Sequence, residues 1–191
     1  EAMESKPRLF DYARCSGLMA DAGLDLILAS RRVSVAYLSG ITSIVCWEYP
    51  HVGHILETQE DDCERADYFV GVARDPAIPP FVVAHRLFEF KQGWIKDLRG
   101  WCFQTTKRSA VDEIVAALEE RGLAGGVIGV EMDYIPAARF EELRQRLPRA
   151  RLKAADAVLR RMRMVKTAEE LRRARRAFEV ETEIYRRVFR E

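Results

Sequence analysis

The sequence predicts an α/β fold, in which helices pack against a β-sheet. Helical stripes of apolar residues alternate along the chain with short, continuously apolar segments that are typical of buried strands. Hydrophobic residues make up 48% and charged residues 32% of the 191 residues, which is ordinary for a globular protein. The length suits one sizeable domain or two small ones.

The first elements in the chain are expected to be a helix and a strand. The pattern predicts a helix over residues 7–22, with Ser5 as a candidate cap. Gly23 is placed to end this helix in the left-handed conformation, because glycine adopts positive φ without strain. The apolar run at 24–29 follows immediately and predicts a buried strand.

A second helix is expected after this strand, and the sequence then becomes less regular. Ser30 is a candidate N-cap for a short helix that Gly40 closes. Residues 41–67 are the least regular part of the chain, with aromatic, histidine and acidic residues. Two further strands are expected at 68–73 and 81–85, because the prolines between them favour a turn.

The middle of the chain continues the alternation of helix and strand. The pattern at 94–103 is ambiguous and fits another strand or a loop. A helix is expected over 109–121 and a buried strand over 125–131. Pro136 opens another helix, which Pro148 ends.

From Asp156 onward the sequence is strongly helical and basic. Thr167 and Glu170 have the spacing of a capping box, which opens a helix that runs nearly to the last residue. The helix carries an apolar stripe: Leu171, Ala174, Phe178, Tyr185 and Val188. Such a helix needs something to bury against, so we expect the chain to stop in mid-protein. We therefore expect Phe178, Tyr185 and Phe189 to be more exposed than the core residues Leu28 and Val130.

Three segments together resemble a known family. Tyr-Leu-Ser-Gly at 37–40 is similar to the Tyr-Leu-Thr-Gly signature of creatinase, prolidase and aminopeptidase P. Ile-Gly-Val-Glu at 128–131, followed by Pro136, resembles a late strand and helix of their N-terminal domain. Residues 156–171 resemble the junction with the catalytic domain, whose signature positions are Arg163, Lys166, Thr167 and Glu170.

The resemblance implies a fold and a domain organisation. The fold is a mixed β-sheet flanked by helices on both faces, with a ribonuclease H-like motif, ending in a long linker helix. Residues 1–6 are a cloning remnant and N-terminal tail, 7–166 the creatinase/prolidase N-terminal domain, and 167–191 a linker helix at the start of an absent C-terminal catalytic domain.

The family's metal site is not expected in this chain. In these enzymes the catalytic domain binds two divalent metal ions, Mn, Co or Zn, through Asp, Asp, His, Glu and Glu. Residues 168–191 contain no Asp and no His. We therefore expect no catalytic residue, no metal and no cofactor in this chain, and no peptidase activity from it alone.

The resemblance also implies a role. The chain is expected to be the non-catalytic N-terminal domain of a metal-dependent hydrolase resembling Xaa-Pro aminopeptidases and dipeptidases, supporting a homodimer and shaping active-site access. One alternative is a domain of a creatinase-like C–N hydrolase that acts on a small non-peptide substrate. The other is a catalytically silent protein-interaction module.

The irregular segment holds the candidate substrate contacts. In the family, the loop after the Tyr-Leu-Thr-Gly signature often reaches the neighbouring subunit's active site, so Trp47, Tyr49, His51 and His54 are candidates for a wall of the partner's pocket. His51, His54 and Cys63 are also acceptable zinc ligands, but one His-x-x-His is a weak signal. Ordinary loop residues are the third interpretation.

The junction residues have two interpretations. Asp156, Arg163 and Lys166 either position the two domains or lie on a solvated surface.

Charge patterning argues against nucleic acid as a partner. Residues 144–191 hold 16 Arg and Lys against 7 Asp and Glu. The glutamates interleave with the arginines, however, and this alternation suits ion pairs on a helix surface. No apolar stretch resembles a membrane span or a signal peptide, so a cytoplasmic protein with reduced cysteines is expected.

Overall fold

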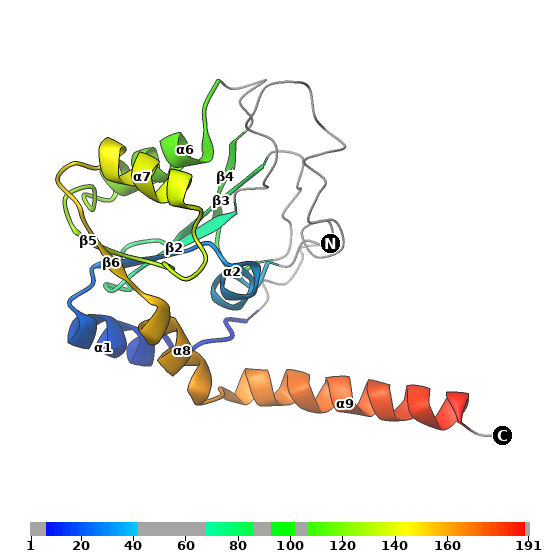
Figure 1. The fold of residues 1–191 in the computed structure, drawn as a ribbon. Coiled ribbons are helices and arrows are strands. Elements are labelled where there is room, and N and C mark those ends of the chain that lie inside the picture. Colours follow the sequence, from blue (N-terminus) through cyan, green and yellow to red (C-terminus); the bar gives the residue numbers. More distant parts are fainter. Residues whose placement is uncertain (1–6, 42–67, 86–92, 102–106, 190–191) are drawn as a thin grey trace.

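The computed structural model describes residues 7–41, 68–85, 93–101 and 107–189. Within these ranges the strands form one six-stranded sheet of order β4-β3-β2-β1-β5-β6 (Figure 1). The strands are β1 Leu26–Ala29, β2 Phe69–Ala73, β3 Phe81–His85, β4 Asp97–Trp101, β5 Val127–Val130 and β6 Arg151–Ala154. Strand β2 is antiparallel to β1 and β3, whereas the pairs β1–β5, β5–β6 and β3–β4 are parallel. The sheet is mixed, as expected.

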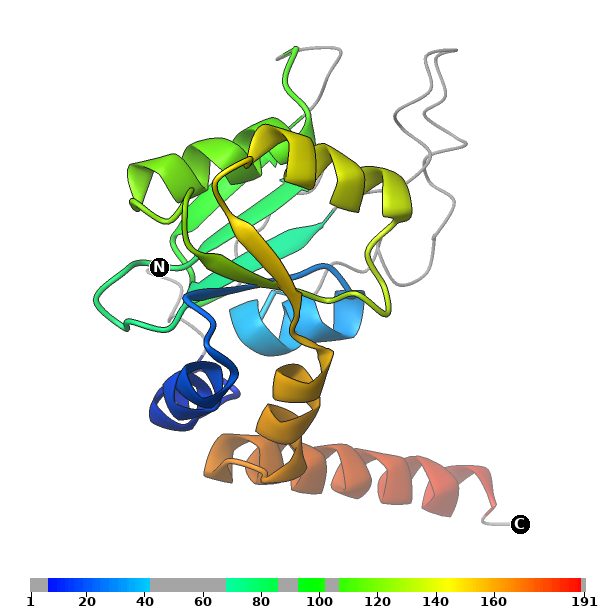
Figure 2. The same ribbon diagram turned by 60° about the vertical axis from the view of Figure 1, so that its left-hand side comes forward.

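Helices cover both faces of this sheet (Figures 1 and 2). They are α1 Tyr12–Ala22, α2 Arg32–Ser39, α6 Ala110–Glu120, α7 Ala137–Arg146, α8 Asp156–Met164 and α9 Ala168–Val188. Helices α1, α2 and α8 share one hydrophobic core with the sheet, and α6 and α7 share the other. The fold class is confirmed.

Strand β1 lies at the centre and faces both cores. Leu26 and Leu28 pack in the core beneath α6 and α7, whereas Ile27 and Ala29 pack in the core beneath α1, α2 and α8. All four side chains are at most 1% exposed. A strand that is buried on both faces reads as a continuous apolar run, which is why the sequence identified it.

The first helix begins later than the sequence predicted. Helix α1 starts at Tyr12, and its N-cap is Asp11, whose carboxylate accepts from a backbone N–H three residues along. The predicted start at residue 7 was wrong, and Ser5, the predicted cap, lies outside the described residues. The carbonyl of Leu9 instead accepts a 2.8 Å hydrogen bond from the hydroxyl of Thr167, far along the chain. This tertiary contact favours a non-helical conformation before Asp11.

The cap of α2 was also predicted wrongly. The N-cap is Arg31, which makes no side-chain capping bond, and the Ser30 hydroxyl has no hydrogen-bond partner among the described residues. Glu131, immediately after β5, accepts from the backbone at this helix start instead. The capping group therefore comes from 100 residues away in sequence.

Strand β6 was missed by the sequence analysis. It reads Arg-Leu-Lys-Ala, lies at the edge of the sheet and is at most partly buried. Four residues with no apolar run carry little local strand signal. The ambiguous segment at 94–103 contains strand β4.

Helix α9 was predicted correctly, including its cap. The Thr167 hydroxyl accepts from the Glu170 amide at 3.2 Å, and the Glu170 carboxylate accepts from the Thr167 amide at 2.9 Å. The helix extends away from the domain (Figure 1) and has no buried residue. Phe178, Tyr185 and Phe189 are 65%, 57% and 72% exposed, against 1% for Leu28 and 0% for Val130. The expected exposure is confirmed.

None of the described helices combines the length and the apolar character needed to cross a bilayer.

Candidate functional site

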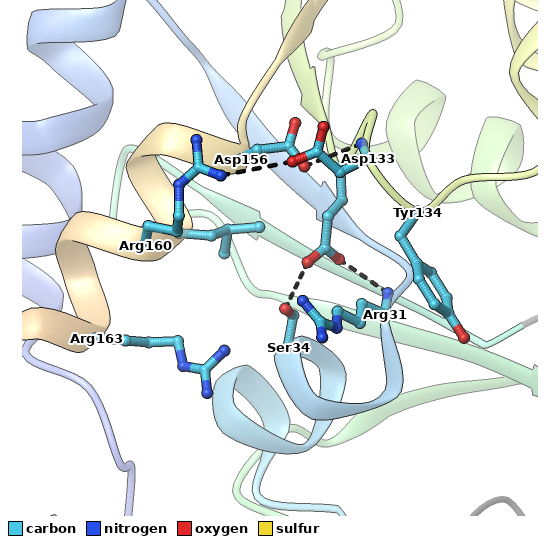
Figure 3. Close-up of a pocket in the computed structure, with 9 residues that line it drawn as sticks. Arg31, Ser34, Asp133, Tyr134, Asp156, Arg160 and Arg163 are labelled. Atoms are coloured by element: carbon cyan, nitrogen blue, oxygen red, sulfur yellow. Dashed lines mark hydrogen bonds and ion pairs between the residues drawn. The ribbon is translucent and has the colours of Figure 1, made fainter.

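A pocket of about 280 Å³ lies where the carboxyl ends of β1, β5 and β6 meet. Helix α2 follows β1 and α8 follows β6, so both helices begin at this edge. Open α/β sheets commonly bind ligands just beyond the carboxyl ends of their strands. The residues lining this strand-end pocket, shown in Figure 3, are Arg31, Ser34, Glu131, Asp133, Tyr134, Asp156, Leu159, Arg160 and Arg163.

Glu131 is the buried carboxylate of the strand-end pocket, with 5% of its surface exposed. One oxygen accepts from the backbone N–H groups of Ser30 at 3.1 Å and Arg31 at 2.8 Å, and the other accepts from the Ser34 hydroxyl at 2.6 Å. A carboxylate at a helix N-terminus is stabilised by the helix dipole and satisfies otherwise unpaired N–H groups. Glu131 therefore joins β5 to α2, and both of its carboxylate oxygens accept hydrogen bonds in doing so.

Asp156 joins the turn after β5 to α8. Its carboxylate oxygens accept from the backbone N–H groups of Met132 at 3.0 Å and Asp133 at 3.1 Å. The Asp133 carboxylate lies 3.5 Å from Arg160, and these two side chains are 74% and 70% exposed. A pair this exposed adds little to stability. Of the residues expected at the junction, Asp156 fixes a turn.

Arg31 and Arg163 bring positive charge to the same space. Figure 3 shows both side chains ending between α8 and α2. The Arg163 guanidinium lies 5.9 Å from the centroid of the Tyr37 ring, a cation–π distance. Burial raises the pKa of Tyr37 to about 12, with a further contribution from Glu170, so its hydroxyl stays neutral.

The end of α8 is anchored to the domain by Arg14 of α1. Its guanidinium donates to the carbonyl oxygens of Arg161 at 2.7 Å and Val165 at 3.3 Å. These are among the last carbonyls of α8, which lack partners within the helix. Basic side chains satisfy such carbonyls and interact favourably with the helix dipole.

The other predicted junction residues lie at the start of α9. Lys166 donates to the carbonyl of Arg163 and lies 3.9 Å from the Glu170 carboxylate. Thr167 donates its hydroxyl hydrogen to Leu9 while capping α9. The junction is therefore tied both to α8 and to the segment before α1, which sets the direction in which α9 leaves the domain.

The predicted loop residues lie outside the described part of the chain. These are Trp47, Tyr49, His51, His54 and the alternative zinc ligand Cys63. Among the described residues, no group of three or more His, Cys, Asp or Glu side chains is placed to hold a metal ion. Burial, with a smaller contribution from Asp11, raises the pKa of the Cys15 thiol to about 12, so Cys15 is not an activated nucleophile.

Several residues of the strand-end pocket were not singled out from the sequence as site residues. They are Arg31, Ser34, Glu131, Asp133, Tyr134, Leu159 and Arg160. Glu131 could have been singled out from the sequence, because an acidic residue directly after a buried apolar strand is expected to need a hydrogen-bond or ion-pair partner. The contacts between Glu131 and α2 span about 100 residues, and no local pattern reveals them.

The fold and the pocket together define a three-layer α/β domain followed by a projecting amphipathic helix. Residues 12–165 match the Creatinase/Prolidase N-terminal domain family. The chain belongs to this family, which confirms the resemblance seen in the sequence. No curated protein sequence matches the chain significantly.

Solved structures agree with this fold. The N-terminal domain of the cytoplasmic peptidase PepQ from Mycobacterium tuberculosis H37Rv is 15% identical with a TM-score of 0.57, covering 80% of this chain and 97% of that one. A proline dipeptidase from Streptococcus pneumoniae is 17% identical with a TM-score of 0.58, covering 83% and 100%. The prolidase from Pyrococcus horikoshii OT3 is 19% identical with a TM-score of 0.55, covering 84% of this chain but 37% of that one.

Proposed function

We propose that this chain is the non-catalytic N-terminal domain of a metal-dependent hydrolase of the Xaa-Pro peptidase type. In this proposal it supports a cytoplasmic homodimer and narrows access to the active site. The N-terminal domain ends at residue 166, and the linker helix of residues 167–191 leads into the catalytic domain. That catalytic domain holds two divalent metal ions, Mn, Co or Zn. The observation that carries the proposal is the exposed apolar side of α9 at an anchored junction.

The exposed side chains of α9 favour a protein partner. They are Leu171, Phe178, Val180, Ile184, Tyr185, Val188 and, just after the helix, Phe189. Fully burying one large apolar side chain stabilises by roughly 1.5–3 kcal/mol, so several together supply a substantial driving force for docking. A catalytic domain that continues from α9 is the natural partner, and the Pyrococcus prolidase chain extends well beyond the matched part.

The substrate contacts in this proposal come from the segment that precedes β2 in the sequence. Trp47, Tyr49, His51 and His54 of one subunit wall the pocket of the other, giving shape and a group that titrates near neutral pH. A peptide whose second residue is proline is the substrate that the family relationship favours.

Kinetics of the full-length parent protein test the proposal. With Mn and an Xaa-Pro dipeptide, we expect Trp47→Ala and His54→Ala each to raise KM about tenfold without loss of metal, since a pocket contact contributes about 1–3 kcal/mol to discrimination. Arg149→Ala is the control, because Arg149 is an exposed residue just before β6 and lies far along the sequence from Trp47 and His54. Unchanged kinetics in both loop variants would assign Trp47 and His54 to the ordinary loop interpretation.

The sequence that follows α9 in the parent distinguishes the alternatives. The five metal ligands are expected there. Their absence would overturn the enzyme assignment in favour of a silent interaction module. Their presence with hydrolysis of a small amide, and none of Xaa-Pro dipeptides, would select the creatinase-like alternative.

A further inference from the structure

We propose that the strand-end pocket binds a small organic carboxylate between Arg31 and Arg163. The proposal does not depend on the catalytic domain, because every residue that it uses lies in the described part of this chain. It assigns a ligand class to a pocket whose carboxylates are already engaged.

Among the described residues, the pocket offers free hydrogen-bond donors, whereas the carboxylates of Glu131 and Asp156 are already engaged. Both oxygens of Glu131 and both of Asp156 accept hydrogen bonds from the protein itself. The guanidinium groups of Arg31 and Arg163 have no hydrogen-bond or carboxylate partner among the described residues, and both end in the space between α2 and α8 (Figure 3). A ligand that fits must therefore accept hydrogen bonds, not donate them.

The formal charges select a monoanion. Three arginines and three acidic residues line the pocket, so their formal charges cancel. A dianion such as phosphate would add two negative charges beside Glu131 and Asp156, whereas a carboxylate adds only one. A carboxylate also matches the planar fork of a guanidinium, with which it forms two parallel hydrogen bonds.

The size and lining of the pocket limit the rest of the ligand. A volume of about 280 Å³ lies just below the range of drug-sized sites and suits a molecule of a few carbon atoms. Leu159, 3% exposed, supplies an apolar surface, and the Tyr134 ring stands at the side of the pocket beyond Arg31. A short aliphatic carboxylate satisfies both the charged and the apolar parts.

Arg163 is held in place before any ligand arrives. Its guanidinium lies over Tyr37, and its backbone carbonyl accepts from Lys166. A side chain that is already ordered loses less conformational entropy on binding. The same residue belongs to the junction, so an occupied pocket would lie next to the point where α9 leaves the domain.

Titration of the 191-residue chain tests the proposal, with backbone amide NMR shifts of Met132 and Asp133 as the readout and ionic strength held constant. We expect saturable shifts with propionate and a dissociation constant on the order of millimolar. Propionamide, the neutral isostere, is expected to cause none, and inorganic phosphate to bind more weakly than propionate. Equal shifts with propionamide, or tighter binding of phosphate, would overturn the assignment to carboxylates.

Two variants locate the site. Arg31→Gln and Arg163→Gln are each expected to weaken propionate binding about tenfold, the usual effect of losing one charge-assisted hydrogen-bonded contact. Arg175→Gln on the exposed surface of α9 is the matched control and should leave binding unchanged. Thermal unfolding of each variant checks the fold. If Arg163→Gln unfolds, Arg31→Gln decides alone because Arg31 is exposed, and unweakened binding in that variant would refute the proposal.

Discussion

The α/β domain and helix α9 show two ways in which a sequence specifies local structure. Every residue of β1 and β2 is buried, and these strands exist because both sheet faces are covered. Helix α9 has no buried residue. It is defined instead by its capping box and by ion pairs along its surface, such as Glu169 with Arg172 at 2.7 Å and with Arg173 at 2.6 Å.

This comparison separates the local interactions that form a helix from the burial of side chains that stabilises the fold. Capping and pairs at three- or four-residue spacing are local, and each contributes a few tenths of a kcal/mol to about 1 kcal/mol. Burial needs partners from distant parts of the chain and contributes more for each side chain. Substitutions in the two regions are therefore expected to differ strongly even when the residue type is the same.

The largest effect is expected from removing a buried ring. Phe81 is 0% exposed, and a Cβ built onto Gly71 would lie only 2.2 Å from this ring, so glycine is required beside it. Phe81→Ala should lower the free energy of unfolding by about 3–5 kcal/mol, as measured by urea denaturation.

The matched substitution in α9 sharpens the comparison. Phe178 is 65% exposed, and Phe178→Ala should change the free energy of unfolding of this chain by no more than about 0.5 kcal/mol. Comparable losses in the two variants would show that α9 packs against the domain or against another copy in solution.

A loss smaller than that of Phe81→Ala is expected from the charged network beside Phe81. The Asp97 carboxylate lies 2.5 Å from Arg121 and 3.0 Å from Arg99, and Arg121, with 6% of its side chain exposed, also stacks on the Phe81 ring at 4.8 Å. Asp97→Asn leaves the buried Arg121 cation without this counter-ion. It should cost about 2 kcal/mol at neutral pH, against less than about 0.5 kcal/mol for the exposed Asp133→Asn.

The pH dependence of this effect has a definite sign. Burial raises the pKa of Asp97, but hydrogen bonds from Arg99 and Arg121 outweigh it and hold the pKa below the usual 3.8. A depressed pKa stabilises the fold above the unfolded-state pKa, and the stabilisation is lost as pH falls through the folded-state pKa. The difference between wild type and Asp97→Asn should stay constant near neutral pH and shrink below pH 3.8. A difference that grows on acidification would contradict this.

A loss smaller than that of Asp97→Asn, but larger than that of Phe178→Ala, is expected at the link between the two regions. Arg14→Ala removes the donors to Arg161 and Val165 and should lower the free energy of unfolding by about 1 kcal/mol, since both hydrogen bonds are solvent-exposed. Hydrogen exchange at the Leu171 amide, in the first turn of α9, should become about fivefold faster. Arg175→Ala is the control, and equal exchange in the two variants would mean that Arg14 does not anchor the junction.

Elements with a strong local pattern were predictable from the sequence. The continuous apolar run of β1, the capping box at Thr167 and the left-handed Gly23, with φ of 62°, each follow from a few neighbouring residues. The family could also be recognised, because its three segments are short and occur in a fixed order.

The strand-end pocket was decided by tertiary structure. Glu131 caps α2 across about 100 residues, Thr167 holds the Leu9 carbonyl across 158, and edge strand β6 forms by pairing with β5. Local sequence determines propensity, periodicity and capping, because these depend on groups within about one turn or one strand. A carboxylate at a distant helix start, or an edge strand without an apolar run, is fixed only when the packed sheet brings its partner within hydrogen-bond distance.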